Sequence, residues 1–346
     1  MKKITLIDIA KSLNLSASTI SRALRSSHDI SPDTKKKILD YTKKINYVPN
    51  LSAIGLKTGR SNTLAIILPF ISSSFFFDFY EEISLNLAKT DYKVILLQTF
   101  NDEKLENEAL TFCIQNNIDG IIISPVKNDS NLSMLNYIMD QICPIIIFDR
   151  IHHKLNTFKI GILNDRIIYQ ATEALIKTNH RDIILLLCDG IGENISRVEG
   201  YQNALLKYQI PFKQENIIKI SYFSPKDDIE MQLETKIAAI LHNNPRPNAI
   251  VSSTDTLSLK ILYTLDNLGI SVPEDMHVIG FSNTPFANSL NPPLTTIAQP
   301  TKLMAEKSMD LLLQMIDKKT KKNHFNFNTY FLDCKIEHRK STLPAE

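Results

Sequence analysis

The segment from Thr5 to Arg22 has the pattern of two short helices joined by a tight turn, and it is the feature that most limits how this chain can begin to fold. Thr5 and Asp8 form the Thr-x-x-Asp pattern of a capping box, which satisfies backbone N–H groups at the start of a helix. Asn14 lies where the chain must reverse, and Asn tolerates a positive φ better than most residues. Ser16 can then cap a second helix. The spacing therefore predicts a helix-turn-helix.

The apolar residues of these two helices recur at helical spacing and predict a shared buried face of Ile9, Ala10, Leu13, Ile20 and Leu24. The second helix then turns a small, polar and basic face outward, made of Ala17, Ser18, Ser21, Arg22 and Arg25. Such a face fits the major groove of DNA, where side chains reach base edges. For Ala17, simple helix packing is the alternative.

A third helix is predicted after Ser31-Pro32-Asp33, which places a capping Ser, a Pro and an acid where helices begin. Ile38, Tyr41 and Ile45 repeat at helical spacing and would complete a small core. The lysines around this helix could be only a solvated face. The distribution of charge favours another interpretation, because residues 1–60 carry a net charge of +8 and the remainder carries −6. A basic head on an acidic body indicates a polyanionic partner.

Four motifs follow one another in this head: Thr5-Leu6-x-Asp8-Ile9-Ala10, Leu15-Ser16-x-x-Thr19-Ile20-Ser21-Arg22, Ile30-Ser31-Pro32-Asp33-Thr34 and Asn46-Tyr47-Val48-Pro49-Asn50. In this order they resemble the DNA-binding domain of the LacI/GalR family of regulators. The resemblance implies that the second helix reads base edges through Ala17, Ser18 and Arg22. Of these, Arg22 could bond a guanine edge in bidentate fashion.

The residues after Asn50 match the hinge helix of that family. The resemblance implies that Leu56 is a wedge in the minor groove at the operator centre, where an apolar side chain kinks DNA by unstacking one step. The hinge here reads Ala53-Ile54-Gly55-Leu56, whereas Ala-Arg-Ser-Leu is the commonest pattern. Gly55 lowers helix propensity by about 1 kcal/mol relative to Ala, so we expect this hinge to fold only on DNA. The expected DNA-binding residues are Thr5, Ser16, Ala17, Ser18, Ser21, Arg22, Asn50, Ala53 and Leu56.

From Ser61 onward, short apolar runs alternate with amphipathic helical patterns. Strands that alternate with helices predict parallel sheets covered on both faces. The runs form two series of roughly 100 residues or more, and a single core seldom grows much larger, so we expect two α/β lobes. The predicted strands are 64–68, 94–97, 121–123, 145–148, 183–187, 217–220, 249–252 and 278–281, and the predicted helices are 75–89, 165–179, 195–208, 227–242 and 255–268.

The body carries a series of short motifs: Ile71-Ser72-Ser73-Ser74-Phe75-Phe76, Phe148-Asp149-Arg150, Arg197-Val198-Glu199-Gly200-Tyr201, Val278-Ile279-Gly280-Phe281 and Pro293-Leu294-Thr295-Thr296-Ile297-Ala298-Gln299-Pro300. In this order they resemble the effector-binding core of the same family, itself similar to periplasmic sugar-binding proteins. The resemblance implies two doubly wound parallel-sheet lobes, three crossings between them near 160, 292 and 322, and a helix 301–317 packed on the first lobe. The expected domains are a helix-turn-helix head at 1–46, a hinge at 47–60, a first lobe at 61–160 plus 293–321, and a second lobe at 161–292 plus 322–346.

Polar and aromatic side chains follow several of the predicted strands, and ligands of open parallel sheets bind beyond the carboxyl ends of the strands. Their mixture of acids, guanidinium groups, amides and rings suits a polyhydroxylated ligand. By the resemblance, Asp149 and Arg197 grip sugar hydroxyls. The alternatives are a helix cap for Asp149, a surface ion pair with Glu193 or Glu199 for Arg197, and plain core for Phe75. The expected effector-binding residues are Ser74, Phe75, Ser124, Asp149, Arg150, Arg197, Phe223, Asp255 and Asn283.

Ser282-Asn283 stands where many members of the family have Asp-Asp, which leaves the identity of the ligand open.

The four cysteines lack C-x-x-C spacing and three lie in or beside apolar runs, so we expect buried thiols in a reducing compartment. The eight histidines form no H-x₃-H pair, and the nine glycines form no Walker A loop and no G-x-G-x-x-G, so neither a metal nor a cofactor is expected. No apolar run reaches membrane length and the start is not secretory, which predicts a cytoplasmic protein.

Three classes of function can be compared with this sequence. A nucleotide-dependent dehydrogenase would explain the α/β body but lacks its phosphate loop, and a sugar-transport protein would need export and no DNA-binding head. A ligand-controlled transcription factor explains the head, hinge and lobes together. We therefore expect a non-enzymatic regulator, most simply a repressor, whose affinity for double-stranded operator DNA is changed by a small sugar-like effector. One helix-turn-helix covers few base pairs, so a homodimer on a pseudo-palindrome is expected, and the tail after Arg339 has no leucine heptads for a coiled-coil tetramer.

Overall fold

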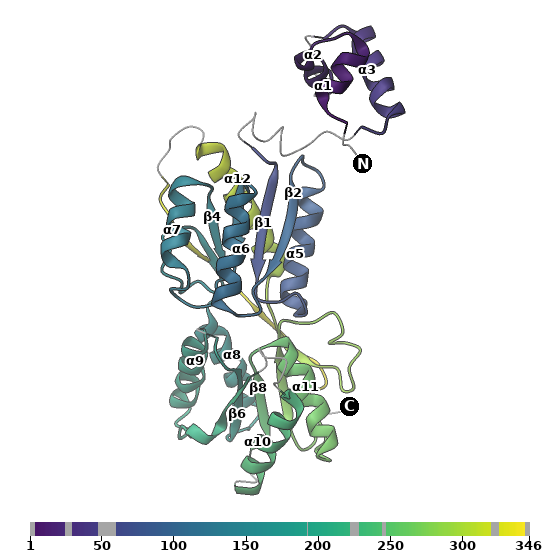
Figure 1. The fold of residues 1–346 in the computed structure, drawn as a ribbon. Coiled ribbons are helices and arrows are strands. Elements are labelled where there is room, and N and C mark those ends of the chain that lie inside the picture. Colours follow the sequence, from purple (N-terminus) through teal and green to yellow (C-terminus); the bar gives the residue numbers. More distant parts are fainter. Residues whose placement is uncertain are drawn as a thin grey trace. The chain divides into compact units, whose positions relative to one another are not determined.

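The computed structural model describes residues 4–24, 30–47, 60–191, 193–221, 228–243, 247–319 and 325–342, in two compact units, Met1–Ser61 and Asn62–Glu346 (Figure 1). The hinge residues and several expected contacts lie outside the described residues: Arg25, Asn50, Ala53, Leu56 and Phe223.

The first unit contains three helices, α1 (Leu6–Leu13), α2 (Ala17–Leu24) and α3 (Pro32–Lys44). The predicted capping box is present, with the Asp8 N–H donating to Thr5 Oγ1 at 3.3 Å and the Thr5 N–H donating to Asp8 Oδ2 at 2.9 Å. Asn14 has φ 52° and ends α1, as expected for the residue that reverses the chain. Ser16 Oγ accepts from the Thr19 N–H at 3.1 Å and so caps α2. The predicted helix-turn-helix is confirmed.

The core of this unit is small and apolar. Ile9, Ile20 and Ile38 are almost fully buried, as their spacing predicted, and Leu13 and Leu24 pack partly against them. Ala23 is also fully buried, although the sequence did not single it out. An alanine carries too little apolar surface to stand out in a helical pattern, yet its small size lets α2 approach its neighbours closely.

The second unit contains two lobes, each built on one six-stranded sheet. In the first lobe the strand order is β11-β5-β4-β3-β1-β2, and every neighbouring pair is parallel. The strands are β1 (Thr63–Leu68), β2 (Lys93–Gln98), β3 (Gly120–Ile123), β4 (Ile145–Phe148), β5 (Lys159–Gly161) and β11 (Thr329–Phe331).

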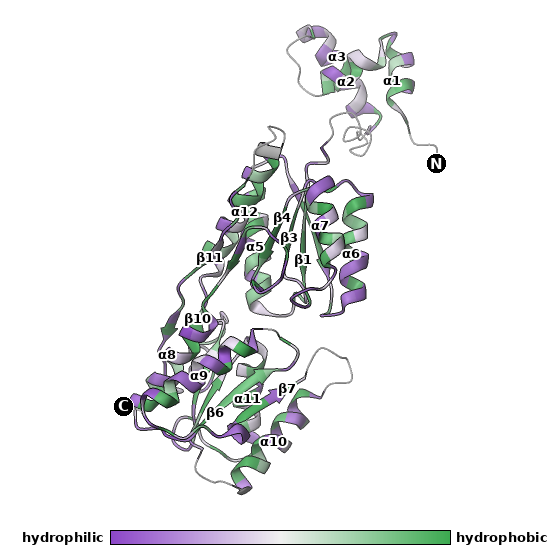
Figure 2. Cartoon of the chain, turned by 90° about the vertical axis from the view of Figure 1, so that its left-hand side faces the viewer, coloured by the Kyte–Doolittle hydropathy of each residue, from purple (hydrophilic) through white to green (hydrophobic). Residues whose placement is uncertain are grey.

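Helices cover both faces of this sheet. They are α5 (Ser74–Leu87) and α12 (Thr301–Lys319) on one face, and α6 (Glu103–Gln115) and α7 (Leu132–Gln141) on the other. Successive residues of β1 point to opposite faces, so Leu64 and Ile66 pack under α5 and α12, whereas Ala65 and Ile67 pack under α6 and α7. Figure 2 shows the result, with apolar strands and helices that are apolar on the side facing the sheet.

The second lobe repeats this arrangement with strand order β12-β10-β9-β8-β6-β7, in which only the β12–β10 pair is antiparallel. Its strands are β6 (Ile183–Cys188), β7 (Ile217–Ile220), β8 (Ala249–Ser252), β9 (His277–Phe281), β10 (Thr295–Ala298) and β12 (Lys335–Glu337). Its helices are α8 (Asn164–Lys177), α9 (Asn194–Lys207), α10 (Ile229–Asn243) and α11 (Asp255–Asn267), with a 3₁₀ turn at Gln214–Asn216. The expected fold class, two doubly wound lobes after a helical head, is confirmed.

The chain crosses between the lobes three times, and two crossings lie later in the sequence than expected. The first follows β5, close to the expected position of 160. The second lies at 299–300 rather than near 292, because β10 pairs with β9 in the second lobe. The third lies at 332–334 rather than near 322, because β11 pairs with β5 in the first lobe. Residues 293–298 therefore belong to the second lobe, and 325–331 to the first. Helix α12 packs on the first lobe beside α5, as expected.

Among the described residues, no helix has both the length and the apolar character needed to cross a membrane. The four cysteines are free thiols; Cys113, Cys143 and Cys188 are buried, as predicted, and Cys334 is half-buried. Burial raises the pKa of the Cys113 thiol to about 12, so this thiol is unreactive at neutral pH.

Candidate functional site

The outward face of α2 is narrower than its sequence pattern predicts. Ser18 and Arg22 are exposed and Ser21 is half-buried, but Ala17 packs partly against the core of the head. The environment of Ala17 therefore agrees largely with the alternative interpretation, in which this residue packs within the head. Of the groups on α2, the exposed guanidinium of Arg22 is the one best placed to reach a base edge, whereas the exposed Ser18 hydroxyl is also engaged with Ser16.

Two further residues expected to contact DNA have their hydroxyl groups engaged within the head. Thr5 caps α1 through Asp8, and Ser16 Oγ lies 2.7 Å from Ser18 Oγ and 2.8 Å from Thr19 Oγ1. Both residues are exposed, and backbone N–H groups at a helix start suit a phosphate. The exposed lysines of α3 add positive charge to this unit: Lys36, Lys37, Lys43 and Lys44.

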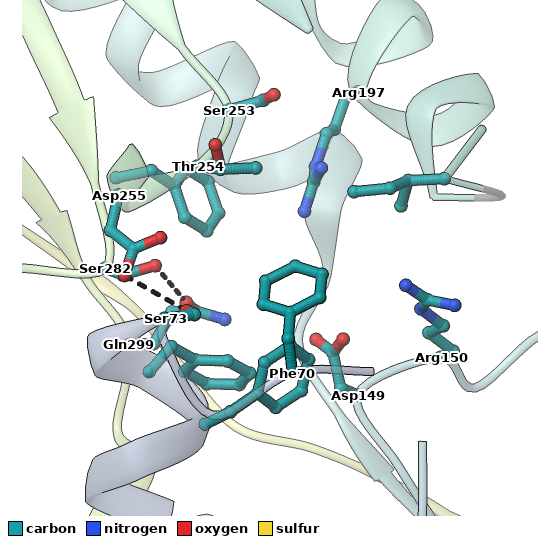
Figure 3. A pocket seen from close by; sticks show the side chains of 14 residues that line it. Phe70, Ser73, Asp149, Arg150, Arg197, Ser253, Thr254, Asp255, Ser282 and Gln299 are labelled. Atoms are coloured by element: carbon teal, nitrogen blue, oxygen red, sulfur yellow. Dashed lines mark hydrogen bonds between the residues drawn. The ribbon is translucent and has the colours of Figure 1, made fainter. Parts of the chain in front are cut away.

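A pocket lies between the two lobes, beyond the carboxyl ends of their parallel strands (Figure 3). The space between its side chains, including the open mouth, is about 470 Å³. Six of the residues expected to bind an effector meet here or beside it: Ser74, Phe75, Asp149, Arg150, Arg197 and Asp255. Its lining consists of Phe70, Ser73, Phe75, Phe76, Asp149, Arg150, Ile191, Arg197, Ser253, Thr254, Asp255, Phe281, Ser282 and Gln299.

Asp149 lies at the carboxyl end of β4 and points into the pocket (Figure 3). Its φ of 65° is unusual for an aspartate and turns the chain sharply out of the strand. Burial and the nearby Glu193 carboxyl group raise the pKa of Asp149 to about 7, against the opposing effect of Arg150 and Arg197. Asp149 therefore exists in both protonation states near neutral pH and can donate or accept a hydrogen bond from a ligand.

Arg197 enters the pocket from α9 in the second lobe (Figure 3). Its Nε donates to Asn164 Oδ1 at 3.0 Å, and its guanidinium lies 5.1 Å from the centre of the Phe281 ring. Gly200, one turn further along α9, allows this placement, because a Cβ there would lie 2.0 Å from the backbone oxygen of Asp165 on α8. Arg197 is buried in the pocket wall, so the alternative of a surface ion pair does not describe it.

Arg150 follows Asp149, but its guanidinium turns toward the protein. Nη1 donates to Asn101 Oδ1 at 2.6 Å and to the backbone oxygens of Pro125 and Val126 at 2.9 and 3.0 Å. These bonds tie together the loops that follow β2, β3 and β4. Arg150 lines the pocket, and its Nη1 holds these loops together.

Asp255, at the start of α11 in the second lobe, bonds to the first lobe. Its Oδ2 accepts from Ser73 Oγ at 3.0 Å, from the Ser74 N–H at 2.7 Å and from Ser74 Oγ at 2.9 Å (Figure 3 shows the Ser73 bond). Oδ1 accepts from the Thr256 N–H at 2.8 Å. The carboxylate therefore lies at the N-termini of both α5 and α11, where helix dipoles favour a negative charge.

Three of the expected effector residues that the structure describes do not line the pocket: Ser74, which bonds to Asp255 beside it, Asn283 and Ser124. Asn283 Oδ1 accepts from Thr296 Oγ1 and from Arg339 Nη2, both at 2.9 Å, so its side chain serves the second lobe. Ser124 is fully buried at the end of β3 and is not part of the pocket lining. Strand-end position alone suggested Asn283 and Ser124, and it does not show which way a side chain turns.

Several lining residues were missed or not selected from the sequence. Thr254 and Ser282 follow β8 and β9 and satisfy the same strand-end criterion. Gln299 lies at a crossing between the lobes and accepts a hydrogen bond from Ser282 Oγ at 2.9 Å. The apolar lining residues Phe70, Phe76, Ile191 and Phe281 carry no signal that distinguishes them from core. Among the described residues, no group of three or more His, Cys, Asp or Glu side chains could hold a metal ion.

Comparison with known proteins agrees with this architecture. Residues 5–50 match the model of bacterial regulatory proteins of the lacI family, and residues 172–342 match that of a periplasmic-binding-protein-like domain. A probable HTH-type transcriptional repressor of Bacillus subtilis, ExuR, is 30% identical over 335 residues, which cover 95% of this chain and 97% of the relative.

Two solved structures show the same fold at 21% identity. The lac repressor dimer bound to operator and the anti-inducer ONPF has a TM-score of 0.81, covering 99% of this chain and 100% of its own. The complex of the transcriptional regulator CelR with cellobiose has a TM-score of 0.69, covering 98% and 100%. With a helix-turn-helix head, two lobes around a pocket and a relative of this similarity over nearly its whole length, the chain belongs to the lacI family of bacterial regulatory proteins.

Proposed function

We propose that this regulator binds a pseudo-palindromic operator as a homodimer and that a small polyhydroxylated effector in the pocket between its lobes changes its affinity for that operator. The main observation in support of this proposal is the pocket between the lobes. It is formed by both lobes, it is lined by aromatic rings and ionisable groups, and a separate basic unit precedes it in the chain.

The head supplies the DNA contacts in this proposal. Arg22 and Ser18 contact bases, the lysines of α3 contact phosphates, and the residues around Leu56 bind the minor groove. One head covers few base pairs, so two copies related by a twofold axis are needed for a specific site. The lac repressor structure, a dimer on its operator, supports this arrangement.

The effector acts by changing how the lobes are arranged. Asp149 lies in the first lobe and Arg197 in the second, so a ligand held by both couples the lobes. It can shift the arrangement only by binding one state more tightly than another. The bonds from Ser73 and Ser74 to Asp255 stabilise one such state without a ligand. The cellobiose complex of a protein with this fold supports a carbohydrate or related polyol.

The role we infer is regulatory rather than enzymatic, and it places the protein in the cytoplasm with the DNA that it binds. The test is an operator selected from random DNA with the full chain, followed by anisotropy titrations of that operator with a panel of sugars. A sugar should change operator affinity in the unmodified protein and should have no effect in Asp149→Ala and Arg197→Ala variants that still bind the operator. An active sugar that affects both variants normally would place the site elsewhere.

A further inference from the structure

We propose that His153 is a positioning residue for the effector site: its neutral ring fixes the loop that carries Asp149 and Arg150, and protonation of the ring releases that loop. The inference rests on the proposed function, because the site that His153 positions is the proposed effector pocket. It adds a dependence on pH that the proposed function alone does not require.

The loop at 149–155 follows β4 and forms part of the pocket wall. Asp149 and Arg150 line the pocket (Figure 3). His152 reaches the second lobe, where its Nε2 lies 3.5 Å from Ser196 Oγ. A loop holds one conformation only where contacts with the rest of the protein offset the entropy of ordering it. The position of Asp149 therefore depends on what holds this loop.

His153 is the buried histidine of the loop and has no exposed surface. Its Nδ1 accepts a hydrogen bond from the Leu155 N–H at 3.1 Å, and its Nε2 lies 3.0 Å from the backbone oxygen of Ser130. A backbone N–H only donates and a carbonyl oxygen only accepts, so these two contacts require a neutral ring with its proton on Nε2. The two bonds are therefore specific to one protonation state and one tautomer.

These bonds attach the 149–155 loop to the segment 125–131, which follows β3 and leads into α7. His153 binds this segment near its α7 end, whereas Arg150 binds it near its β3 end. The Lys154 N–H adds a hydrogen bond to the backbone oxygen of Asn128 at 2.7 Å. Two side chains thus hold the loop to one neighbouring segment, and release of His153 would remove one of the two.

Protonation of His153 is incompatible with this arrangement. The second proton would lie on Nδ1 and point at the Leu155 N–H, so that two donors would face one another. The cation would also be buried, which is unfavourable. Burial accordingly lowers the pKa of His153 and outweighs the opposing effect of the bond to Ser130. The loop is therefore held firmly only while the ring is neutral.

Charged side chains face this histidine from the elements around it: Glu106 of α6, Asp129 of the segment 125–131 and Lys159 of β5. Both acids already accept hydrogen bonds, Glu106 from the segment 125–131 and Asp129 from Lys154. Lys159 donates to the backbone oxygen of the histidine and opposes a second positive charge there. The Nδ1 atom points at a backbone N–H and not at either acid, so a proton on it gains no acceptor.

The first experiment is nitrogen-15 NMR of the histidine rings in the full chain without effector. It distinguishes the two tautomers and follows their titration, and the His153 signal is the one that disappears in His153→Asn. We expect one tautomer, with the proton on Nε2, and a titration below the ordinary value of 6.5. A proton on Nδ1, or a titration at or above that value, would overturn the inference.

The second experiment is hydrogen–deuterium exchange of the full chain, at pH 8 and at one pH unit below the midpoint found by NMR, with rates corrected for the intrinsic effect of pH. Exchange within 149–155 should rise about ten-fold on protonation, because one buried hydrogen bond is lost. His153→Asn keeps an acceptor where Nδ1 lies and does not titrate, so its loop should respond little to pH. His153→Phe should exchange faster at both values.

The matched control for this comparison is His242→Asn, a change at an exposed histidine of α10, which should behave like the unmodified protein. A rise in exchange at low pH that persists undiminished in His153→Asn would assign the effect to another group and overturn the inference. Equal protection of the loop in the unmodified protein at both pH values would do the same.

The third experiment connects the loop with the pocket. Glucose, galactose and cellobiose are titrated by calorimetry at pH 8 into the unmodified protein, His153→Phe and His153→Asn. A sugar that binds the unmodified protein should bind His153→Phe about ten-fold less tightly, because the loop that carries Asp149 is no longer fixed. The same sugar should bind His153→Asn nearly normally, since the bond from Leu155 is kept.

The outcomes separate this inference from the proposed function. A sugar that changes operator affinity and binds His153→Phe as tightly as the unmodified protein overturns the inference and leaves the proposed function standing. A loop that is released on protonation, in a protein whose operator affinity responds to no sugar, supports the inference about the loop and contradicts the proposed function.

Discussion

The Asp255 carboxylate of the second lobe accepts hydrogen bonds from both the backbone N–H and the hydroxyl of Ser74 in the first lobe, at 2.7 and 2.9 Å. The accepting atom in both bonds is Asp255 Oδ2, which also accepts a hydrogen bond from Ser73 Oγ. A charged acceptor at a helix start is favoured by the helix dipole, so these bonds hold the two lobes together where α5 and α11 begin. The structural role of Asp255 is therefore a contact between the lobes and not the binding of a ligand.

The strength of this contact can be measured by a double-mutant cycle of Ser74→Ala and Asp255→Asn. We expect each variant to lower the free energy of unfolding by about 1–2 kcal/mol, with a coupling energy of about 1 kcal/mol between them. Asp266→Asn, a change at an exposed position of the same helix α11, should have no effect. Additive effects of the two changes would show that the bond contributes nothing across the lobes.

The raised pKa of Asp149 makes stability depend on pH. Its value of about 7 exceeds that of an unfolded aspartate, 3.8, so folding favours the protonated form. The stability that this proton contributes is complete below about pH 4 and is lost as the pH rises to about 7. Asp149→Asn removes the titration. The difference in urea midpoint between the two proteins should therefore increase from pH 4 to pH 7 in favour of the variant, and a constant difference would contradict the assignment.

The two kinds of DNA contact should respond differently to substitution. Arg22→Ala should weaken binding to the selected operator by about 1–3 kcal/mol and relax the preference for one base pair, because it removes a contact to a base edge. Lys36→Ala should weaken binding to all sequences more uniformly. It should also reduce the slope of the logarithm of the binding constant against the logarithm of the salt concentration by about 1. Anisotropy titrations against the operator and single-base variants at several salt concentrations distinguish the two. Equal loss on every sequence for Arg22→Ala would mean that it contacts phosphate.

Gly200 should be among the least replaceable residues of the pocket wall. A Cβ at this position would meet the backbone of Asp165, which cannot move without shifting α8. We expect Gly200→Ala to lower the free energy of unfolding by about 1–3 kcal/mol and to weaken effector binding by displacing Arg197. Glu199→Ala, a change at an exposed position of the same helix, is the control. Urea denaturation and calorimetry measure both effects.

The long apolar strands were predictable because their periodicity is strong. β4, β7 and β8 have the predicted bounds, and β1 and β9 each begin one residue earlier. β5, β11 and β12 were missed because each has only three residues, and the last two are half-buried or exposed, so their sequences show no continuous apolar run. The two later crossings were misplaced because β10 and β11 decide where the chain changes lobe, and neither strand was predicted; β10 is short and mixes two threonines with apolar residues.

The candidate pocket was predictable in part. Strand ends meet at one edge of each parallel sheet, so position in the sequence is enough to place Asp149 and Arg150 at that edge of the first sheet and Asp255 at that edge of the second. Which of them face a ligand depends on partners distant in sequence. Asn283 accepts a hydrogen bond from Arg339, and Asp255 accepts one from Ser73. Neither hydrogen bond can be predicted from a local sequence pattern. Glu193 stands out in the sequence only as a neighbour of Arg197, because burial cannot be read from a single acidic residue.

Helix α12, late in the chain, covers a face of the first sheet that is made near its beginning. Leu312 and Ile316 approach Gly120 of β3 so closely that a Cβ there would lie about 3.0 Å from the Leu312 side chain. As the chain leaves the ribosome, β1, β3 and β4 are complete long before residues 301–319 have been made. The first lobe therefore keeps part of one apolar face, beside α5, uncovered while most of the second lobe is synthesised, and apolar surface that is exposed during synthesis favours aggregation.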